Sequence, residues 1–149
     1  MSERPGPAAL VSWTVAGPRL LSDDEVRAVV RAALEQGGRP QLLLSVVFVS
    51  DAELATLHGR HLGDPSPTDV MAFDLAEEGG GPAGEVYVSV ERARAEARAR
   101  DLAPERELAL YILHGCLHLC GHDDHRPRAR ARMRAAERAV LARLGYAGE

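Results

Sequence analysis

The pattern of hydrophobic residues along the chain first predicts four β-strands. Four segments show the alternating or continuous β-branched pattern of strands, at 8–15, 41–50, 70–75 and 85–90. The second, QLLLSVVFVS, is too long in apolar residues for a surface strand, so we expect it at the centre of the sheet and buried on both faces. The glycine-rich segment between the last two predicts an antiparallel hairpin.

Capping signals and helical spacing predict about five helices. The sequence SDDE at 22–25 is a capping box, in which Ser22 accepts a hydrogen bond from the amide of Glu25 and the Glu25 side chain reaches back. Gly37 ends the helix that follows. Further helices are expected after Ser50, at 91–101, from Pro104 to about Gly121, and from about Pro127. The last has a core stripe of Met133, Ala136, Val140 and Leu144.

Length and composition predict a single domain. With 149 residues, of which 46% are hydrophobic, the chain is long enough for one core and too short for two. We expect one domain over 1–149, with 1–7 as a loose tail. No apolar run has the length of a membrane span, and the first residues lack a signal-peptide pattern, so we expect a cytoplasmic protein without membrane contact.

The charge distribution argues against a broad positive surface. The net charge is −4, so nucleic acid would have to bind a local basic patch. All 18 basic residues are arginine, and a cluster of them follows residue 125. We expect these late arginines to form a solvated helix face, with bidentate phosphate binding as the alternative.

The segment LHGCLHLCGHDDH at 113–125 has the pattern of a metal site. His114 and His118 are four residues apart on a predicted helix, so their imidazoles lie on one face and can converge on one ion. Gly121 can end the helix and turn the chain back, which brings Asp123, Asp124 and His125 toward that ion. Two helical ligands, one loop ligand and an open position for water define a catalytic zinc site. The alternative is two histidines that are hydrogen-bonded in a polar groove.

The spacing is also similar to the metal-binding motif of metzincin proteases. Those enzymes place a glutamate general base directly after the first histidine. Gly115 occupies that position here, so the protease interpretation lacks its base.

Three segments together resemble the YbeY family of rRNA-maturation endoribonucleases. Residues 114–121, HGCLHLCG, match the fixed positions of the family signature. TDVMAFD at 68–74 and GEVYVSVERARAEA at 84–97 are similar to two further family segments, so the resemblance covers roughly residues 45–145. It implies an α+β fold in which a small mixed sheet of about four strands packs with about five helices. The metal site would lie on a helix and the loop after it.

The resemblance also implies an activity, a cofactor and partners. The family cleaves single-stranded RNA in rRNA maturation, including 3′-end processing of small-subunit rRNA, and in ribosome quality control. For this chain it implies one Zn²⁺, held by His114 and His118, which would act in catalysis through the metal-bound water. The implied partners are single-stranded or precursor rRNA and the ribosome or its small subunit.

Two positions depart from the family pattern. Counted without gaps from His114, the family's third histidine falls on Asp124, so we favour Asp124 as the third ligand, with His125 as the alternative. The family's phosphate-binding arginine aligns with Leu62, so we expect either that Arg60 or the late arginines take over that catalytic role or that phosphate binding is weaker.

The other chemically reactive residues have structural interpretations as well. Cys116 and Cys120 lie on the opposite side of the helix from the histidines, so we expect buried thiols rather than ligands. His58 and His61 are either partnered or exposed histidines, or they reach the cleft. Asp69 is either a helix or turn cap or a carboxylate that orients a ligand imidazole. His122 and Asp123 are either solvated loop residues or an acid and a base.

The leading hypothesis is therefore a zinc-dependent endoribonuclease. One rival is a metal hydrolase of another substrate, such as a peptide. The other is a non-catalytic ribosome assembly factor whose metal is structural. A structural zinc has four protein ligands, whereas a catalytic zinc keeps an open position.

Overall fold

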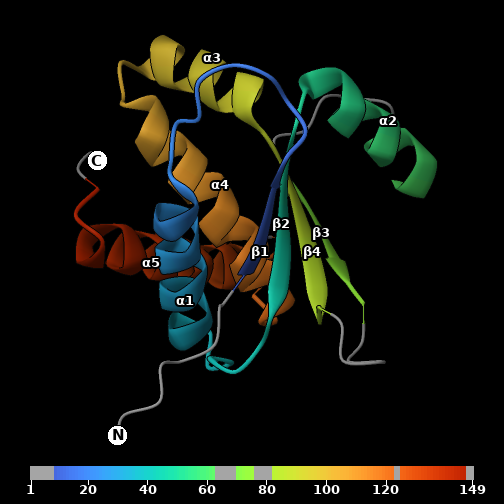
Figure 1. Ribbon diagram of the computed structural model, residues 1–149. Coiled ribbons are helices and arrows are strands. Elements are labelled where there is room, and N and C mark those ends of the chain that lie inside the picture. Colours follow the sequence, from blue (N-terminus) through green and yellow to red (C-terminus); the bar gives the residue numbers. More distant parts are fainter. Residues whose placement is uncertain (1–8, 63–69, 76–81, 123–124, 147–149) are drawn as a thin grey trace, which may run out of the picture.

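Figure 1 shows the computed structural model, which describes residues 9–62, 70–75, 82–122 and 125–146. In chain order the elements are β1 (Ala9–Trp13), α1 (Asp23–Gln36), β2 (Leu44–Val49), α2 (Asp51–Leu62), β3 (Val70–Asp74), β4 (Gly84–Ser89), α3 (Val90–Arg100), α4 (Pro104–Leu119) and α5 (Pro127–Arg143). Every one of them overlaps the segment for which the sequence predicts it. The capping box at Ser22 and Glu25 is also present. The predicted α+β class is confirmed.

The strands form one mixed sheet in the order β1-β2-β4-β3. β2 is parallel to β1 and to β4, while β3 is antiparallel to β4, which confirms the predicted hairpin. β2 is central, as predicted, but Ser45 and Val47 on one of its faces are only half-buried. The reason is that this face packs against the short helix α2, whereas α1, α4 and α5 lie on the other face (Figure 1).

Helix α4 packs directly on the sheet at Gly115. A Cβ atom at Gly115 would lie 2.6 Å from Cγ1 of Val86 and 3.2 Å from Cγ2 of Val70, which is closer than van der Waals contact. This close approach therefore requires glycine. It also sets the rotation of α4, because the residues around Gly115 enter the core while His114 and His118 stay half-buried at its edge.

Helix α5 packs against α4 through the predicted apolar stripe. Met133, Ala136 and Val140 are buried. Glu137 lies on the same stripe and is only 3% exposed. A buried carboxylate needs a partner, and the partner of Glu137 lies on α4. None of the helices in the described ranges is long and apolar enough to cross a membrane.

Candidate metal centre

The imidazole rings of His114 and His118 converge at one edge of α4. Their Nε2 atoms are 3.1 Å apart, and the ring planes are nearly perpendicular at 84°. Two nitrogen ligands at about 2.0–2.1 Å from one tetrahedral zinc ion lie roughly 3.3 Å apart. The observed 3.1 Å is close to this separation, and it is also the length of a hydrogen bond between the two rings, which is the arrangement present in the structure.

Glu137 of α5 fixes the orientation of the first of these rings. Its Oε2 atom lies 2.7 Å from Nδ1 of His114. Because an ionised carboxylate only accepts hydrogen bonds, this contact favours the tautomer in which Nδ1 carries the proton and donates a hydrogen bond to Glu137. In that tautomer the ring has its lone pair on Nε2, the atom that faces His118. A carboxylate behind a histidine is the arrangement by which proteins orient a metal-ligating imidazole.

The sequence interpretation missed Glu137, although a signal was present. Glu137 stands four residues after Met133 and three before Val140, so it falls on the apolar stripe of α5. Glutamate is almost never fully buried unless it is paired. A glutamate within the apolar stripe of the next helix after the two histidines therefore indicates a hydrogen bond that orients one of them.

The sequence predicts the third ligand in the segment after α4. Among the described residues, no group of three or more His, Cys, Asp or Glu side chains could hold a metal ion. Asp124 and the neighbouring Asp123 lie outside the described residues, and His125 is exposed. The choice of Asp124 over His125 therefore stays a prediction.

A turn at Gly121 follows the two histidines directly, as predicted. Helix α4 ends at Leu119, and Gly121 has φ of 99°, in the left-handed region that favours glycine. The amides of Gly121 and His122 donate to the carbonyls of His118 and Leu117, each at 3.0 Å. These bonds satisfy the last carbonyls of the helix and redirect the chain just after the second histidine.

The packing at Gly115 also bears on the protease alternative. A glutamate at this position would place its Cβ 2.6 Å from Cγ1 of Val86. The contact that positions the two histidines thus excludes the general base that a metzincin needs.

The prediction of buried thiols is confirmed for Cys116 but not for Cys120, which is only partly covered. Cys116 is fully buried, and the half-buried Cys120 lies against Gly37 of the turn after α1. Burial raises the pKa of the Cys116 thiol, and Cys120 adds to this effect. Burial also raises the pKa of the Cys120 thiol, although the charge of Arg39 opposes it. A thiol held in its neutral form is a poor metal ligand and a poor nucleophile.

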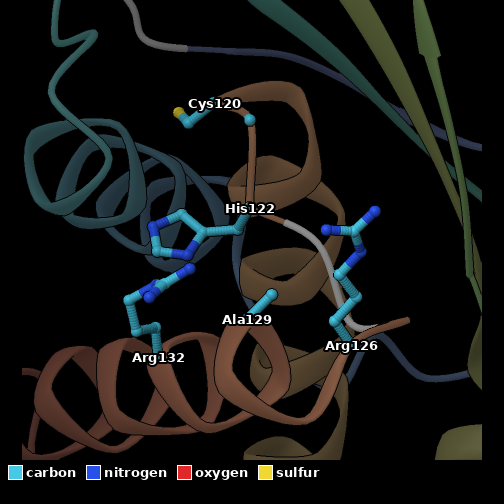
Figure 2. A pocket seen from close by; sticks show the side chains of 6 residues that line it. Cys120, His122, Arg126, Ala129 and Arg132 are labelled. Carbon is cyan, nitrogen blue, oxygen red and sulfur yellow. The ribbon is translucent and has the colours of Figure 1, made fainter.

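A basic pocket of about 460 Å³ lies at the C-terminal end of α4 (Figure 2). Its lining consists of Cys120, Gly121, His122, Arg126, Ala129 and Arg132. Figure 2 shows the guanidinium group of Arg132 beside the ring of His122, with Arg126 on the opposite rim. Two of the late arginines, which are solvent-exposed as expected, therefore line a pocket beside the turn that follows the second histidine.

The structure places Arg60 apart from this centre. Arg60 is exposed on α2, and α2 lies across the sheet from α4 (Figure 1). The described residues therefore do not bring Arg60 beside His114, and its catalytic role stays a prediction. His58 lies half-buried on the same helix. The side chains of His61 and Leu62, and all of Asp69, lie outside the described part of the chain.

The fold and the histidine pair define an α+β protein with a candidate metal centre built on one helix. The family model described as endoribonuclease YbeY matches residues 19–145. The chain belongs to the endoribonuclease YbeY family.

Individual relatives agree with this assignment. The endoribonuclease YbeY of Symbiobacterium thermophilum is 36% identical over 135 residues, which cover 83% of this chain and 86% of that protein. The endoribonuclease YbeY of a Chelativorans species is 31% identical and covers 95% of this chain and 93% of its own length. The solution structure of TM1509 from Thermotoga maritima matches with a TM-score of 0.60 at 23% identity, over 91% of this chain and 90% of that one. The structural match supports the fold.

Proposed function

We propose that this protein is a zinc-dependent endoribonuclease that cleaves single-stranded RNA during rRNA maturation in the cytoplasm. Membership in the endoribonuclease YbeY family supports the cleavage of RNA. The observation that carries the metal dependence is the 3.1 Å separation of the two Nε2 atoms, together with the contact between His114 and Glu137. One Zn²⁺ per chain would be held by His114, His118 and a third ligand, with Asp124 favoured over His125.

In the proposed reaction the metal ion and the protein residues have different roles. A bound Zn²⁺ supplies a Lewis acid, which polarises a phosphoryl oxygen or lowers the pKa of water toward about 7. Glu137 holds the proton of His114 on Nδ1, so that Nε2 keeps its lone pair. Because Gly115 has no side chain, α4 lies close against the sheet, and this position sets the direction of both histidines.

The pocket at the end of α4 is suited to bind the RNA backbone. Arg126 and Arg132 line it together with His122. A guanidinium group binds phosphate oxygens through two parallel hydrogen bonds. Because the chain has a net charge of −4, such a local patch has to supply most of the attraction for RNA. We propose precursor rRNA on the small ribosomal subunit, near the 3′ end of its rRNA, as the substrate.

The test compares RNA and peptide cleavage by the purified protein. A labelled single-stranded RNA, the same RNA annealed to its complement, and a peptide are each incubated with the protein as purified, after chelation, and after zinc is added back. We expect cleavage of the single-stranded RNA alone, loss on chelation and recovery with zinc. His114→Ala should abolish cleavage, whereas His58→Ala, on the other side of the sheet, should retain it.

Two outcomes would contradict the proposal. RNA cleavage that survives both chelation and His114→Ala comes from a contaminating nuclease. Stoichiometric zinc without cleavage of any single-stranded RNA, in a protein that binds small ribosomal subunits, would instead identify an assembly factor with a structural metal.

A further inference from the structure

A second cavity, of about 140 Å³, lies on the other side of Glu137 from the histidine pair. Its lining consists of Arg100 at the end of α3, Arg106 and Leu110 of α4, and Arg134, Glu137, Arg138 and Leu141 of α5. Cavities that hold drug-sized ligands have volumes of roughly 300–1,000 Å³. This cavity therefore has room for one small group rather than for a nucleoside.

The floor of the cavity contains a buried, unsatisfied donor. Arg106 is 6% exposed, and its Nε atom has no hydrogen-bond partner among the described residues. Its Nη1 atom donates to Oε1 of Glu107 at 2.9 Å, so the charge of the group is paired while Nε keeps an unused N–H. A buried charged donor without a partner is costly, so its presence points to a ligand that accepts from it.

The formal charges around the cavity favour an anion. Four guanidinium groups line or enter it, opposed by the two carboxylates of Glu107 and Glu137, which leaves a formal charge of +2. Both carboxylates are already engaged: Glu137 accepts from Arg134 and contacts His114, and Glu107 pairs with Arg106 and Arg100. The rim is accessible, since the side chains of Arg134 and Arg100 are 54% and 42% exposed.

We propose that this cavity binds a single phosphate group, with Arg106 at its floor and Arg138 at its rim. A phosphate dianion matches the formal charge, and its oxygens match the fork geometry of guanidinium groups. The group would come either from RNA or from free phosphate. This inference goes beyond the proposed function, because it concerns a site separated from the metal centre by Glu137 and requires no cleavage.

The test is a phosphate titration of the full-length protein at constant ionic strength, with chloride as the balancing anion. Binding is measured by calorimetry and by the ¹⁵N–¹H signal of the Arg106 Nε–H group. Both are recorded with zinc and after chelation, because a phosphate held by a metal ion would dissociate with the ion. We expect saturable binding that survives chelation and shifts the Arg106 signal.

Variants separate this site from general electrostatic attraction. Arg138→Ala, on the exposed rim, should weaken phosphate binding by about tenfold, the size of effect typical of one charge-assisted contact. Arg31→Ala makes the same change of charge on an exposed position of α1 and should leave binding unchanged. Arg106→Met should abolish phosphate binding. If this variant fails to fold, Arg138→Ala and the Arg106 signal of the unmodified protein still test whether the cavity binds phosphate.

Competition identifies the source of the phosphate group. Displacement of inorganic phosphate by 5′-phosphorylated RNA but not by 5′-hydroxyl RNA assigns a terminal phosphate, and displacement by both assigns internal phosphates. Displacement by neither leaves the free ion as the ligand. The proposal is overturned if the Arg106 signal does not move, if chelation abolishes binding, or if Arg138→Ala and Arg31→Ala bind phosphate equally.

Discussion

The two faces of helix α4 contribute to the metal centre in opposite ways. The face toward the sheet is apolar and so close to it at Gly115 that no Cβ atom fits against Val86. The face toward α5 includes a polar contact within apolar packing, in which His114 is hydrogen-bonded to a carboxylate that is itself buried. The first face sets where the helix lies, and the second sets which nitrogen of the ring is available. Changes on the two faces should therefore appear in different measurements, namely protein stability and metal affinity.

The largest effect is expected outside both faces, at the third ligand. We expect Asp124→Ala to lower zinc affinity by more than the roughly 100-fold that loss of an orienting partner costs, because it removes a ligand itself. Zinc content after dialysis against a weak chelator measures this. His122→Ala is the matched control, because His122 belongs to the same segment but lines the pocket of Arg132. Loss of zinc in His125→Ala alone would make His125 the ligand.

On the face toward α5, Glu137→Gln should lower zinc affinity by about 10- to 100-fold. The neutral amide accepts more weakly from Nδ1 of His114 and no longer favours the tautomer that leaves Nε2 free. Competition with a chelator of known affinity measures the loss, and ¹⁵N chemical shifts of the ring report the tautomer.

Glu107→Gln serves as the control for this substitution. Glu107 is buried on α4 and pairs with Arg106, so its loss costs stability without touching His114. Equal zinc affinities in the two variants would contradict the orienting role of Glu137.

On the face toward the sheet, Gly115→Ala should destabilise the protein by about 1–3 kcal/mol, the usual cost of overpacking a core. The new methyl group would sit 2.6 Å from Cγ1 of Val86. Denaturant unfolding measures the loss, and the folded fraction should still bind zinc. Combining it with Val86→Ala should cost less than the two changes added together, because the second makes room for the first. Simple additivity would mean that the two positions do not compete for space.

Local sequence patterns predict the elements and the histidine pair, whereas contacts between distant segments were not predicted. The order of the elements and the pairing of His114 with His118 follow from local patterns, namely caps, periodicity and a four-residue spacing. The partner of His114 lies 23 residues further along, so local patterning could not join them. The partial exposure of Val47 on β2 was missed for the same reason, because it depends on which helix covers each face of the sheet.

The smallest effect is expected at the cysteines, which lie on neither face. Burial raises the pKa of both thiols, so at neutral pH the folded protein holds less thiolate than the unfolded chain. Since the thiolate is the nucleophile, we expect iodoacetamide to modify Cys120 more slowly in the folded protein than in the unfolded chain, and faster as the pH rises toward the raised pKa. The fully buried Cys116 should react only when the structure opens.

Mass spectrometry of samples taken over time measures the modification rates of both cysteines. They should be the same with zinc and after chelation, because neither thiol faces the histidine pair; protection of Cys120 by zinc would instead make it a ligand and place the ion on the other side of α4.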